Sequence, residues 1–483
     1  MKTNKRSKYR PAAGSKERPT LRVAARLAVA CLLAACWAGR TAVADGAGSA
    51  AKATKRPLIC IQIPPWTGDD ENWGGPYDGP TAKRMCLKIL NSEAARLGIE
   101  LTTDAKRMKE CDGAMSLVPQ SPKADIPVVD VLFQGHRVFF DAFQPLHKTW
   151  DLKRKRYLLA STNDPEWLRT GVRLLKAACQ VKNARVCVVT DEPPAADSVH
   201  PQLGTTFHPV ASARLDEAIR KVNDQEAAAV AAEYMHQGRM DGTIEGTSGY
   251  QKMVGEKWYL VDPAFAAKAK QDTIAVARFY LGCRDLLAAE KCQALTLANR
   301  AKYGPAPVLA FSGLADQGIA AAFDRDATLM LLMAGAVLER AGFVHGPLAN
   351  KGKNVFVASY FTCPTRLAGY DFEPPASFSI GPGTGGKGFG IQTRWCKGDE
   401  ITRLQLKDSK VLMTKGKVCY TDITAKDGHC TAVILELENK AGRPDIEASN
   451  CVIVCGNCTN EISCLARLLD LDFPAAEGVL VPR

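Results

Sequence analysis

The sequence lacks the patterns that would place it at once in a well-marked class. After residue 44 it has no apolar run near the roughly 20 residues that a helix needs to cross a bilayer, and it has no internal repeat. No G-x-S-x-G elbow is present, so a serine hydrolase has no support. No H-x-x-x-H or H-E-x-x-H pair marks a metal-binding helix. A repeat protein and a membrane-spanning protein are therefore not expected.

Positive charge is concentrated at the start of the chain. The formal net charge is +12, but residues 1–44 contain ten Lys and Arg against the single Glu17, which leaves a net charge of only +3 for the rest. A mixed surface of this kind has no electrostatic footprint for a polyanion, so no nucleic-acid partner is predicted.

What is present has ordinary globular proportions. The 483 residues are 46% hydrophobic and 24% charged, which excludes a disordered or collagen-like chain and predicts a buried core. At roughly 100 to 200 residues per domain, this length favours two or three domains.

The basic start resembles an export signal. A cationic stretch leads to the apolar run LAVACLLAA at residues 27–35 and then to Ala42-Val43-Ala44, which has the A-x-A form of a cleavage site. We predict a signal peptide at residues 1–44, a linker at residues 45–56, and a periplasmic or extracellular location with no transmembrane span after processing. A lipobox-like LAAC at residues 33–36 leaves a lipoprotein acylated at Cys36 as an alternative, and an uncleaved anchor as another.

Cysteine is abundant, with 17 residues, of which 15 follow the leader. The densest cluster is Cys451-x3-Cys455-x2-Cys458-x5-Cys464, a spacing that suits zinc or an iron–sulfur cluster. However, residues 451–455 form a continuous apolar run, as in a buried strand that carries Cys451 and Cys455 on one face. We therefore predict a disulfide within the cluster, or to Cys430, rather than a metal.

Alternation of apolar runs and amphipathic stretches predicts the fold class. Strand-like runs at residues 58–63, 126–133, 157–160 and 184–189 alternate with helical patterns at residues 81–97 and 165–179. A second such stretch has helices at residues 211–235, 263–289 and 324–341 and strands at residues 292–297 and 308–311. After residue 375 short alternating segments indicate an antiparallel barrel or sandwich, at residues 390–394, 400–406, 410–413, 417–420 and 432–437. We predict an α/β protein in which N-terminal Rossmann-like α/β domains with parallel sheets (residues 57–200 and 201–375) precede a C-terminal antiparallel β-barrel-like domain (residues 376–483).

Two candidate functional features stand out, each with a structural alternative. Asp324 and Asp326 begin a strongly apolar helix, where they could cap its first turn, bind a divalent cation or move protons. Residues 381–388, GPGTGGKG, imitate a phosphate-binding loop, but Gly388 replaces the required Ser or Thr and strand residues follow. This segment is interpreted as a hairpin or a loop at the edge of a substrate site.

Four stretches between residues 264 and 473 form a larger pattern. Residues 306–333, APVLAFSGLADQGIAAAFDRDATLMLLM, combine a strand, a loop ending in Gly-Ile, an acidic turn and a long helix. Residues 353–364 end in YFTCP, and residues 388–416 look like a β-domain. Residues 428–431 and 450–456 look like its last strands. In this order and spacing the stretches resemble the L-fucose/L-arabinose isomerase family, especially its divergent fucose-isomerase-like members.

The resemblance implies aldose–ketose isomerisation through an enediol, at a site in an interdomain cleft. In that family a divalent metal, usually manganese, binds adjacent sugar oxygens while carboxylates transfer the proton. The metal-binding Glu of the family corresponds to Asp324, and the second acid corresponds to Gly346 beside His345. The two histidines correspond to Tyr360 and Cys451.

The replacements remove several donors that a hard cation needs, so manganese retention is not expected. We predict an exported isomerase-like protein with a degraded metal site that binds carbohydrate or has an altered carbohydrate activity, without a cofactor; an oligomer is compatible with the sequence. This prediction assigns catalytic roles to Asp324 and Asp326 and substrate binding to Arg366 and Lys387. If the protein is active, the predicted metal ligands are Asp324, His345 and Cys451. Two alternatives stay open: an active isomerase with a rebuilt site, for which zinc suits a thiolate better than manganese does, and a disulfide-stabilised scaffold without a small-molecule ligand.

Overall fold

The computed structural model of the chain describes residues 56–63, 79–117, 125–133, 155–162, 164–192, 195–237, 252–254, 257–259, 263–299, 301–304, 306–350, 355–360, 362–371, 378–382, 389–393, 395–422, 431–437 and 451–473. The predicted signal peptide, Cys36, Lys387 and Cys430 lie outside these residues, as does the predicted linker except for its last residue.

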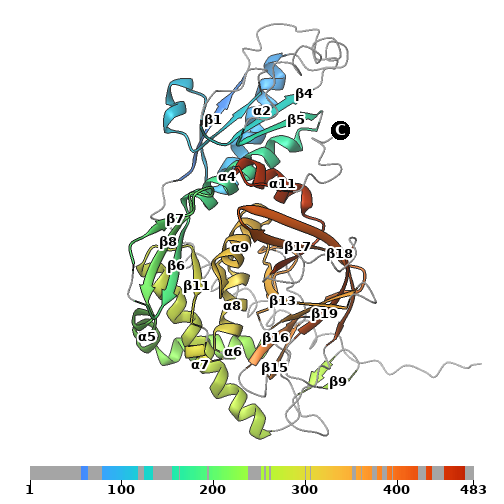
Figure 1. The fold of residues 1–483 in the computed structure, drawn as a ribbon. Coiled ribbons are helices and arrows are strands. Elements are labelled where there is room, and N and C mark those ends of the chain that lie inside the picture. Colours follow the sequence, from blue (N-terminus) through green and yellow to red (C-terminus); the bar gives the residue numbers. More distant parts are fainter. Residues whose placement is uncertain are drawn as a thin grey trace, which may run out of the picture. The chain divides into compact units, whose positions relative to one another are not determined.

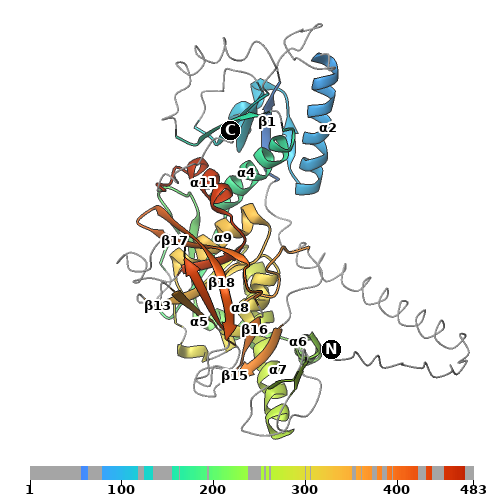
Figure 2. The ribbon, with the colours of Figure 1, turned by 90° about the vertical axis from the view of Figure 1, so that its right-hand side faces the viewer.

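The first sheet is parallel and has the strand order β2-β1-β3-β4-β5. Its strands are β1 (Leu58–Gln62), β2 (Glu100–Thr102), β3 (Gly113–Ser116), β4 (Val128–Phe133) and β5 (Tyr157–Thr162). Helices α2 (Gly79–Leu97) and α4 (Glu166–Asn183) pack against each other, α4 also contacts β3 and β4, and the short helix η2 (Ala105–Glu110) contacts β1. Figure 2 shows α2 and α4 beside β1. The parallel sheet predicted for this part of the chain is confirmed.

The second sheet has the order β12-β11-β6-β8-β7 and is parallel except at its edge strand β7. Its strands are β6 (Arg185–Thr190), β7 (Ser198–Val199), β8 (Thr206–Ala211), β11 (Ala294–Leu297) and β12 (Ala320–Ala322). Figure 1 shows β6, β8 and β11 side by side. Because β6 precedes residue 200 and β8 follows it, this sheet spans the domain boundary predicted there.

The helices of the second sheet correct two predictions. They are α5 (Ser212–Lys221), α6 (Asp224–Gln237), α7 (Pro263–Ala289), η3 (Ala301–Tyr303) and α8 (Ala306–Asp316). The single helix predicted at residues 211–235 is wrong, because the Asn223 carboxamide accepts the amide of Gln225 at 2.7 Å and starts α6 anew. The strand predicted at residues 308–311 is also wrong. That apolar run lies within α8, whose residues Ala310, Phe311 and Leu314 belong to a buried core, and short apolar runs do not distinguish a strand from a buried helix.

The remaining strands form a closed antiparallel barrel of order β13-β14-β19-β18-β17-β20. Its strands are β13 (Phe343–Asn350), β14 (Val355–Tyr360), β17 (Glu400–Lys407), β18 (Lys410–Asp422), β19 (Thr431–Leu437) and β20 (Cys451–Cys455). Helix α11 (Thr459–Leu468) follows, and two antiparallel pairs lie outside the barrel: β9 (Lys252–Val254) with β10 (Lys257–Tyr259), and β15 (Phe378–Pro382) with β16 (Phe389–Thr393). The predicted class of parallel α/β sheets with an antiparallel barrel is confirmed, although the barrel begins before residue 375.

Helix α9 (Arg325–Leu338) connects the sheets to the barrel. It contacts α4 and α11, the sheet strands β11 and β12, and the barrel strands β17 and β20, which explains why it is apolar on nearly every side. Strand β20 separates two cores: Val452 and Val454 belong to the core that contains α9, whereas Ile453 belongs to the core inside the barrel. The buried two-sided strand predicted at residues 451–455 is therefore confirmed.

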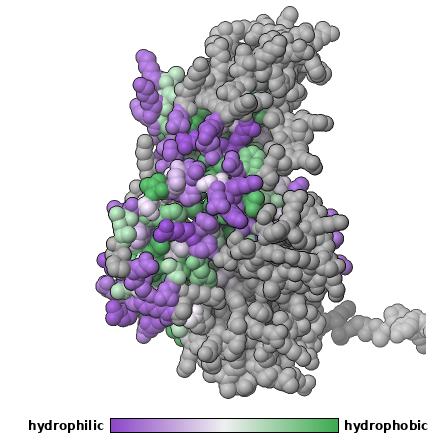
Figure 3. Space-filling view, in the orientation of Figure 1, coloured by the Kyte–Doolittle hydropathy of each residue, from purple (hydrophilic) through white to green (hydrophobic). Residues whose placement is uncertain are grey.

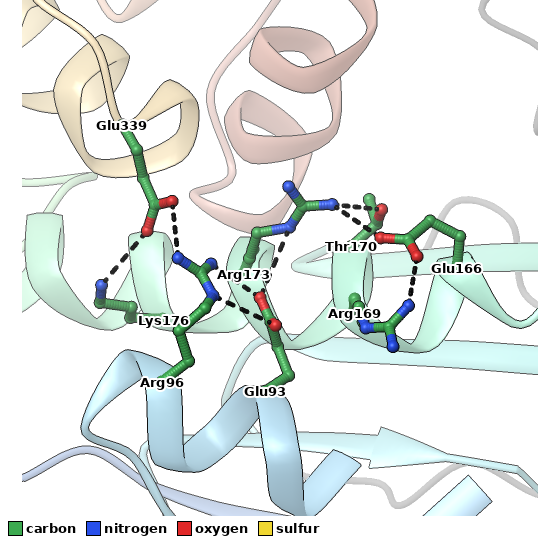
Figure 4. Close-up of polar contacts among 8 residues, drawn as sticks. All are labelled: Glu93, Arg96, Glu166, Arg169, Thr170, Arg173, Lys176 and Glu339. Carbon is green, nitrogen blue, oxygen red and sulfur yellow. Dashed lines mark hydrogen bonds and ion pairs between the residues drawn. The ribbon is translucent and has the colours of Figure 1, made fainter. Parts of the chain in front are cut away.

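A network of charged side chains ties α9 to the helices of the first sheet (Figure 4). Glu93 of α2 accepts from Arg96 at 2.8 Å and lies 3.9 Å from Arg173 of α4. Arg96 also pairs at 3.1 Å with Glu339, the residue that ends α9 in a left-handed conformation with φ 50°. Lys176 of α4 lies 3.8 Å from the same Glu339 carboxylate. The C-terminal end of α9 is thus held by charges from two other helices.

The described surface is mainly hydrophilic. On the face seen in Figure 3, apolar side chains form small separate areas between hydrophilic ones. Among the described residues, the exposed large apolar side chains are those of Met85 and Val199. No described helix combines the length and the apolar character that a membrane span requires.

Candidate functional site

Asp324 caps the first turn of α9. Its backbone is extended, and its Oδ1 accepts the amide of Ala327 at 2.7 Å. The hydroxyl of Thr328 donates to the Asp324 carbonyl at 2.8 Å. A carboxylate at this position satisfies an amide that has no partner within the helix and is favoured by the helix dipole. The capping alternative is therefore confirmed, and one carboxylate oxygen is committed to it.

A buried arginine lies inside the barrel beside the start of β20. Arg403 of β17 is 2% exposed, and its Nη2 donates to Sγ of Cys451 at 2.5 Å. Arg403 pairs directly across the strands with Ile453, whose side chain belongs to the barrel core. The Oε1 atom of Gln405 lies 4.0 Å from the same sulfur. Arg403, Gln405 and Cys451 thus form a polar group within the barrel, which we call the barrel cluster.

Electrostatics in the barrel cluster connect it to Asp324. Burial raises the pKa of the Cys451 thiol to about 11, although the Arg403 guanidinium opposes this shift, and the Asp324 carboxylate raises it further. Burial lowers the pKa of Arg403, and Cys451 partly offsets that change. Arginine nevertheless stays protonated in proteins. Near neutral pH the barrel cluster therefore holds a fixed cation beside a neutral thiol.

The structure brings part of the predicted metal-binding set together. The backbone of His345 on β13 pairs with Cys451 on β20, so the two residues occupy directly opposed positions on neighbouring strands. Asp324 is near enough to act on the Cys451 thiol. Gly346 lies on β13, and Tyr360 ends β14 opposite Thr431. The side chains of His345 and Tyr360 lie outside the description.

Asp326 interacts with His200 rather than with the barrel cluster. Burial raises its pKa, and so does the Asp324 carboxylate, whereas His200 opposes the shift. His200 follows the edge strand β7, and burial lowers its pKa while Asp326 raises it. Asp326 is thus placed between Asp324 and a histidine of the second sheet, and its predicted catalytic role stays a prediction.

Arg366 lies in a structural clamp around Asp316, the last residue of α8. Asp316 Oδ1 accepts the amides of Thr365 and Arg366 at 2.7 and 2.8 Å, and its Oδ2 accepts the Thr365 hydroxyl at 2.7 Å. Burial raises the pKa of Asp316 to about 6, although these hydrogen bonds oppose the shift. The charge of Arg366 also lowers the pKa of Asp316 and so opposes the effect of burial, and the predicted role of Arg366 in substrate binding stays a prediction.

The barrel cluster does not fit a hard divalent cation. Metal ions bind cysteine as the thiolate, but the Cys451 thiol has a raised pKa and accepts a hydrogen bond from a guanidinium. Asp324 uses one oxygen as a helix cap. Within the described part of the chain, no three His, Cys, Asp or Glu side chains are placed to share a metal ion.

Comparison with known proteins adds no assignment. No family model matches the chain, and no curated protein matches its sequence. The family resemblance therefore stays a prediction, and the site is interpreted from its own geometry.

Sequence reasoning missed Arg403 and Gln405. They alternate with Leu404 and Leu406 along β17, a pattern typical of a strand with one face in solvent. Both faces of β17 are in fact buried, because Leu404 and Leu406 pack against the core that contains α9 while Arg403 faces the barrel interior. The signal that could have identified them is the apolar run of β20, which implied that its neighbouring strand is also buried on both faces.

Proposed function

We propose that this chain is an exported, divergent protein of the L-fucose/L-arabinose isomerase type that binds carbohydrate without metal-dependent isomerisation. The order of two parallel α/β sheets and a C-terminal barrel supports the proposal. So does the proximity of Asp324 and Cys451, two positions that the resemblance assigns to the metal.

The contact between Arg403 and Cys451 carries the proposal. A metal in such a site would hold two sugar oxygens and stabilise the negative charge of an enediolate. A guanidinium can donate hydrogen bonds to sugar oxygens. However, its charge is delocalised, and it does not act as a Lewis acid as a metal ion does. Arg403 therefore supports binding of the sugar and supplies little of the stabilisation that removal of a C–H proton needs.

The composition of the barrel cluster suits a polyhydroxylated ligand. Each sugar hydroxyl donates one hydrogen bond and accepts others, so its site needs both kinds of partner. Arg403 supplies donors, Gln405 supplies a donor and an acceptor, and Asp324 supplies an acceptor. Because Arg403, Gln405 and Cys451 are at most 2% exposed, a ligand would have to open the barrel cluster and replace the hydrogen bonds within it, which favours specific recognition.

Calorimetry and product analysis on the purified chain test this function. A panel of aldoses and ketoses is titrated, and the same sugars are then incubated with the protein and Mn²⁺. We expect saturable binding of at least one sugar, unchanged by Mn²⁺, and no ketose product. Robust ketose formation overturns the proposal, and failure of every sugar to bind overturns it as well.

A zinc isomerase rebuilt from Asp324, Asp326, His345 and Cys451 is the second candidate. The direct pairing of His345 with Cys451 favours it, because imidazole and thiolate are good zinc ligands. Metal analysis after mild chelation separates the two candidates. One zinc ion per chain that disappears in Asp324→Ala supports the rebuilt site; a metal content near zero supports the proposed function.

A further inference from the structure

The turn that joins β20 to α11 carries two cysteines three positions apart. Cys455 ends β20, and Cys458 is the N-cap of α11, so the sequence Cys455-Gly456-Asn457-Cys458 connects a strand to a helix N-terminus. The Cys458 thiol donates to the carbonyl of Cys455 at 3.5 Å. No disulfide joins any two of the four cysteines of the sequence cluster, Cys464 included, so the bond predicted within the cluster is not formed; the alternative partner Cys430 lies outside the described residues.

Polar contacts hold this turn in one conformation. Arg340 Nη1 donates to the Cys455 carbonyl at 2.8 Å, and the Gly456 amide donates to the carbonyl of Glu400 at 2.7 Å. Thr402 Oγ1 accepts the amide of Cys458 and donates to the Gly456 carbonyl, both at 2.8 Å. The two thiols are thus held on a rigid loop.

Gly456 allows the close approach of the groups in the turn. Its φ is +92°, which L side chains rarely adopt, and a Cβ there would lie 3.0 Å from Arg340 Nη1 and 3.7 Å from Cys458 Sγ. A larger residue would therefore displace the cation or the second thiol from the loop.

A third thiol, that of the exposed Cys396, lies in the same neighbourhood. Its residue begins the turn that leads into β17, where Ile401 pairs directly with Cys455. Burial raises the pKa of the Cys455 thiol, with further contributions from Asp399 and Cys396, and Arg340 opposes them. Burial also raises the pKa of Cys458 to about 11. The three thiols thus include one that solvent reaches and two that the fold covers.

We propose that Cys455 and Cys458 form a redox-active dithiol that exchanges with low-molecular-weight disulfides, and that Cys396 is the thiol that reacts first. The Cys396 thiolate attacks a small disulfide, forms a mixed disulfide and releases one small thiolate. The thiolate of Cys455 then attacks the Cys396 sulfur and releases the second small thiolate. Finally Cys458 attacks the Cys455 sulfur, which forms the Cys455–Cys458 disulfide and returns Cys396 to a thiol.

The electrons balance in this sequence. The two protein thiols of Cys455 and Cys458 lose two electrons and two protons in total. One small disulfide takes up these electrons and protons and becomes two small thiols. The exposure of Cys396 and the burial of Cys458 set the order of attack, because exchange depends on access as well as on the thiolate fraction. The inference does not depend on the proposed function.

Thiol mapping on the full chain tests the proposal without any variant. The protein is equilibrated with mixtures of reduced and oxidised glutathione, quenched by acid, alkylated and analysed by peptide mass spectrometry. We expect the peptide that contains Cys455 and Cys458 to lose two hydrogens reversibly while Cys396 ends as an alkylated thiol. Both cysteines of the turn remaining alkylated at the most oxidising ratio overturns the proposal.

Three serine variants test the order of attack. Cys396→Ser should slow formation of the Cys455–Cys458 disulfide by at least about tenfold, because the exposed nucleophile that attacks the small disulfide first is lost. Cys458→Ser should accumulate Cys455 as a mixed disulfide or bonded to Cys396. Cys464→Ser is the matched control on α11 and should react like the wild type. Disulfide formation at the wild-type rate in Cys396→Ser overturns the role of Cys396.

Discussion

The guanidinium of Arg403 donates to the thiol of Cys451 across neighbouring strands, with 2.5 Å between nitrogen and sulfur and both residues at most 2% exposed. Removing a cation from water costs several kcal/mol, and a buried ion pair or hydrogen bond offsets only part of that cost. The proposed role of this buried cation in carbohydrate binding can be tested at Arg403 itself.

Replacing Arg403 separates binding from stability. In Arg403→Met the cation is lost and the apolar stem is kept, so we expect carbohydrate affinity to fall at least about tenfold, or about 1.4 kcal/mol, while the fold persists. Isothermal titration and urea unfolding measure the two effects. Arg107→Met, which removes an exposed arginine of η2, serves as the control and should bind sugar normally. Equal affinity in Arg403→Met and wild type would contradict a role for the guanidinium.

The two functions of Asp324 can be separated by a conservative pair of substitutions. Asp324→Ala loses the hydrogen bond to the Ala327 amide and should cost about 1 kcal/mol of unfolding free energy. Asp324→Asn keeps a capping oxygen and should cost only a few tenths of that. If the carboxylate also contacts the ligand, both variants should lose affinity in calorimetry although only Asp324→Ala loses stability. A large loss of stability in Asp324→Asn would show that the charge, not the cap, is the structural element.

Asp316 predicts a dependence of stability on pH. Burial raises its pKa to about 6, well above that of an ordinary aspartate, so the folded state binds a proton more tightly than the unfolded state does. The associated stability is fully present below about pH 4 and is lost as the pH rises through 6, by at most about 3 kcal/mol. Asp316→Asn does not titrate and keeps an oxygen for the amides of Thr365 and Arg366. Urea unfolding at pH 4 to 7 should therefore show that the wild type loses stability relative to Asp316→Asn as the pH rises. A wild type that gains stability relative to Asp316→Asn over this range would mean that the three hydrogen bonds outweigh burial.

Burial should decide how much an ion pair contributes to the free energy of unfolding. This can be tested by comparing Glu93, a member of the charge network in Figure 4, with the exposed Glu110. Glu93 is 7% exposed and accepts two hydrogen bonds from Arg96, so Glu93→Ala should lower the unfolding free energy by about 1.5 to 3 kcal/mol. Glu110→Ala breaks a pair of the same i,i+3 spacing in which Glu110 is 59% exposed, and should have no measurable effect. Chemical denaturation of both variants checks the contrast, and equal losses would show that burial does not set the strength of these pairs.

The sequence predicted helices and strands correctly where the apolar pattern extended over many residues or indicated burial on both faces. The α7 helix has the predicted bounds, residues 263–289, because its apolar positions recur at helical spacing over many turns. Short apolar runs were less informative, as the run at residues 308–311 shows: it is helical because α7 and the second sheet provide a buried surface for α8. Strand β6 was assigned to the first domain because pairing partners are not encoded locally.

The sequence by itself determined the sheet classes, the cap at Asp324 and the buried strand β20, since each depends on local spacing and residue type. Only the tertiary structure decided that Arg403 lies beside Cys451, that Asp316 is clamped by Thr365, and that Cys396 accompanies Cys455 and Cys458. These groups come from segments as much as about 60 residues apart, and long-range strand pairing and burial bring them together. Their charges and pKa values depend on that burial, which no local pattern contains.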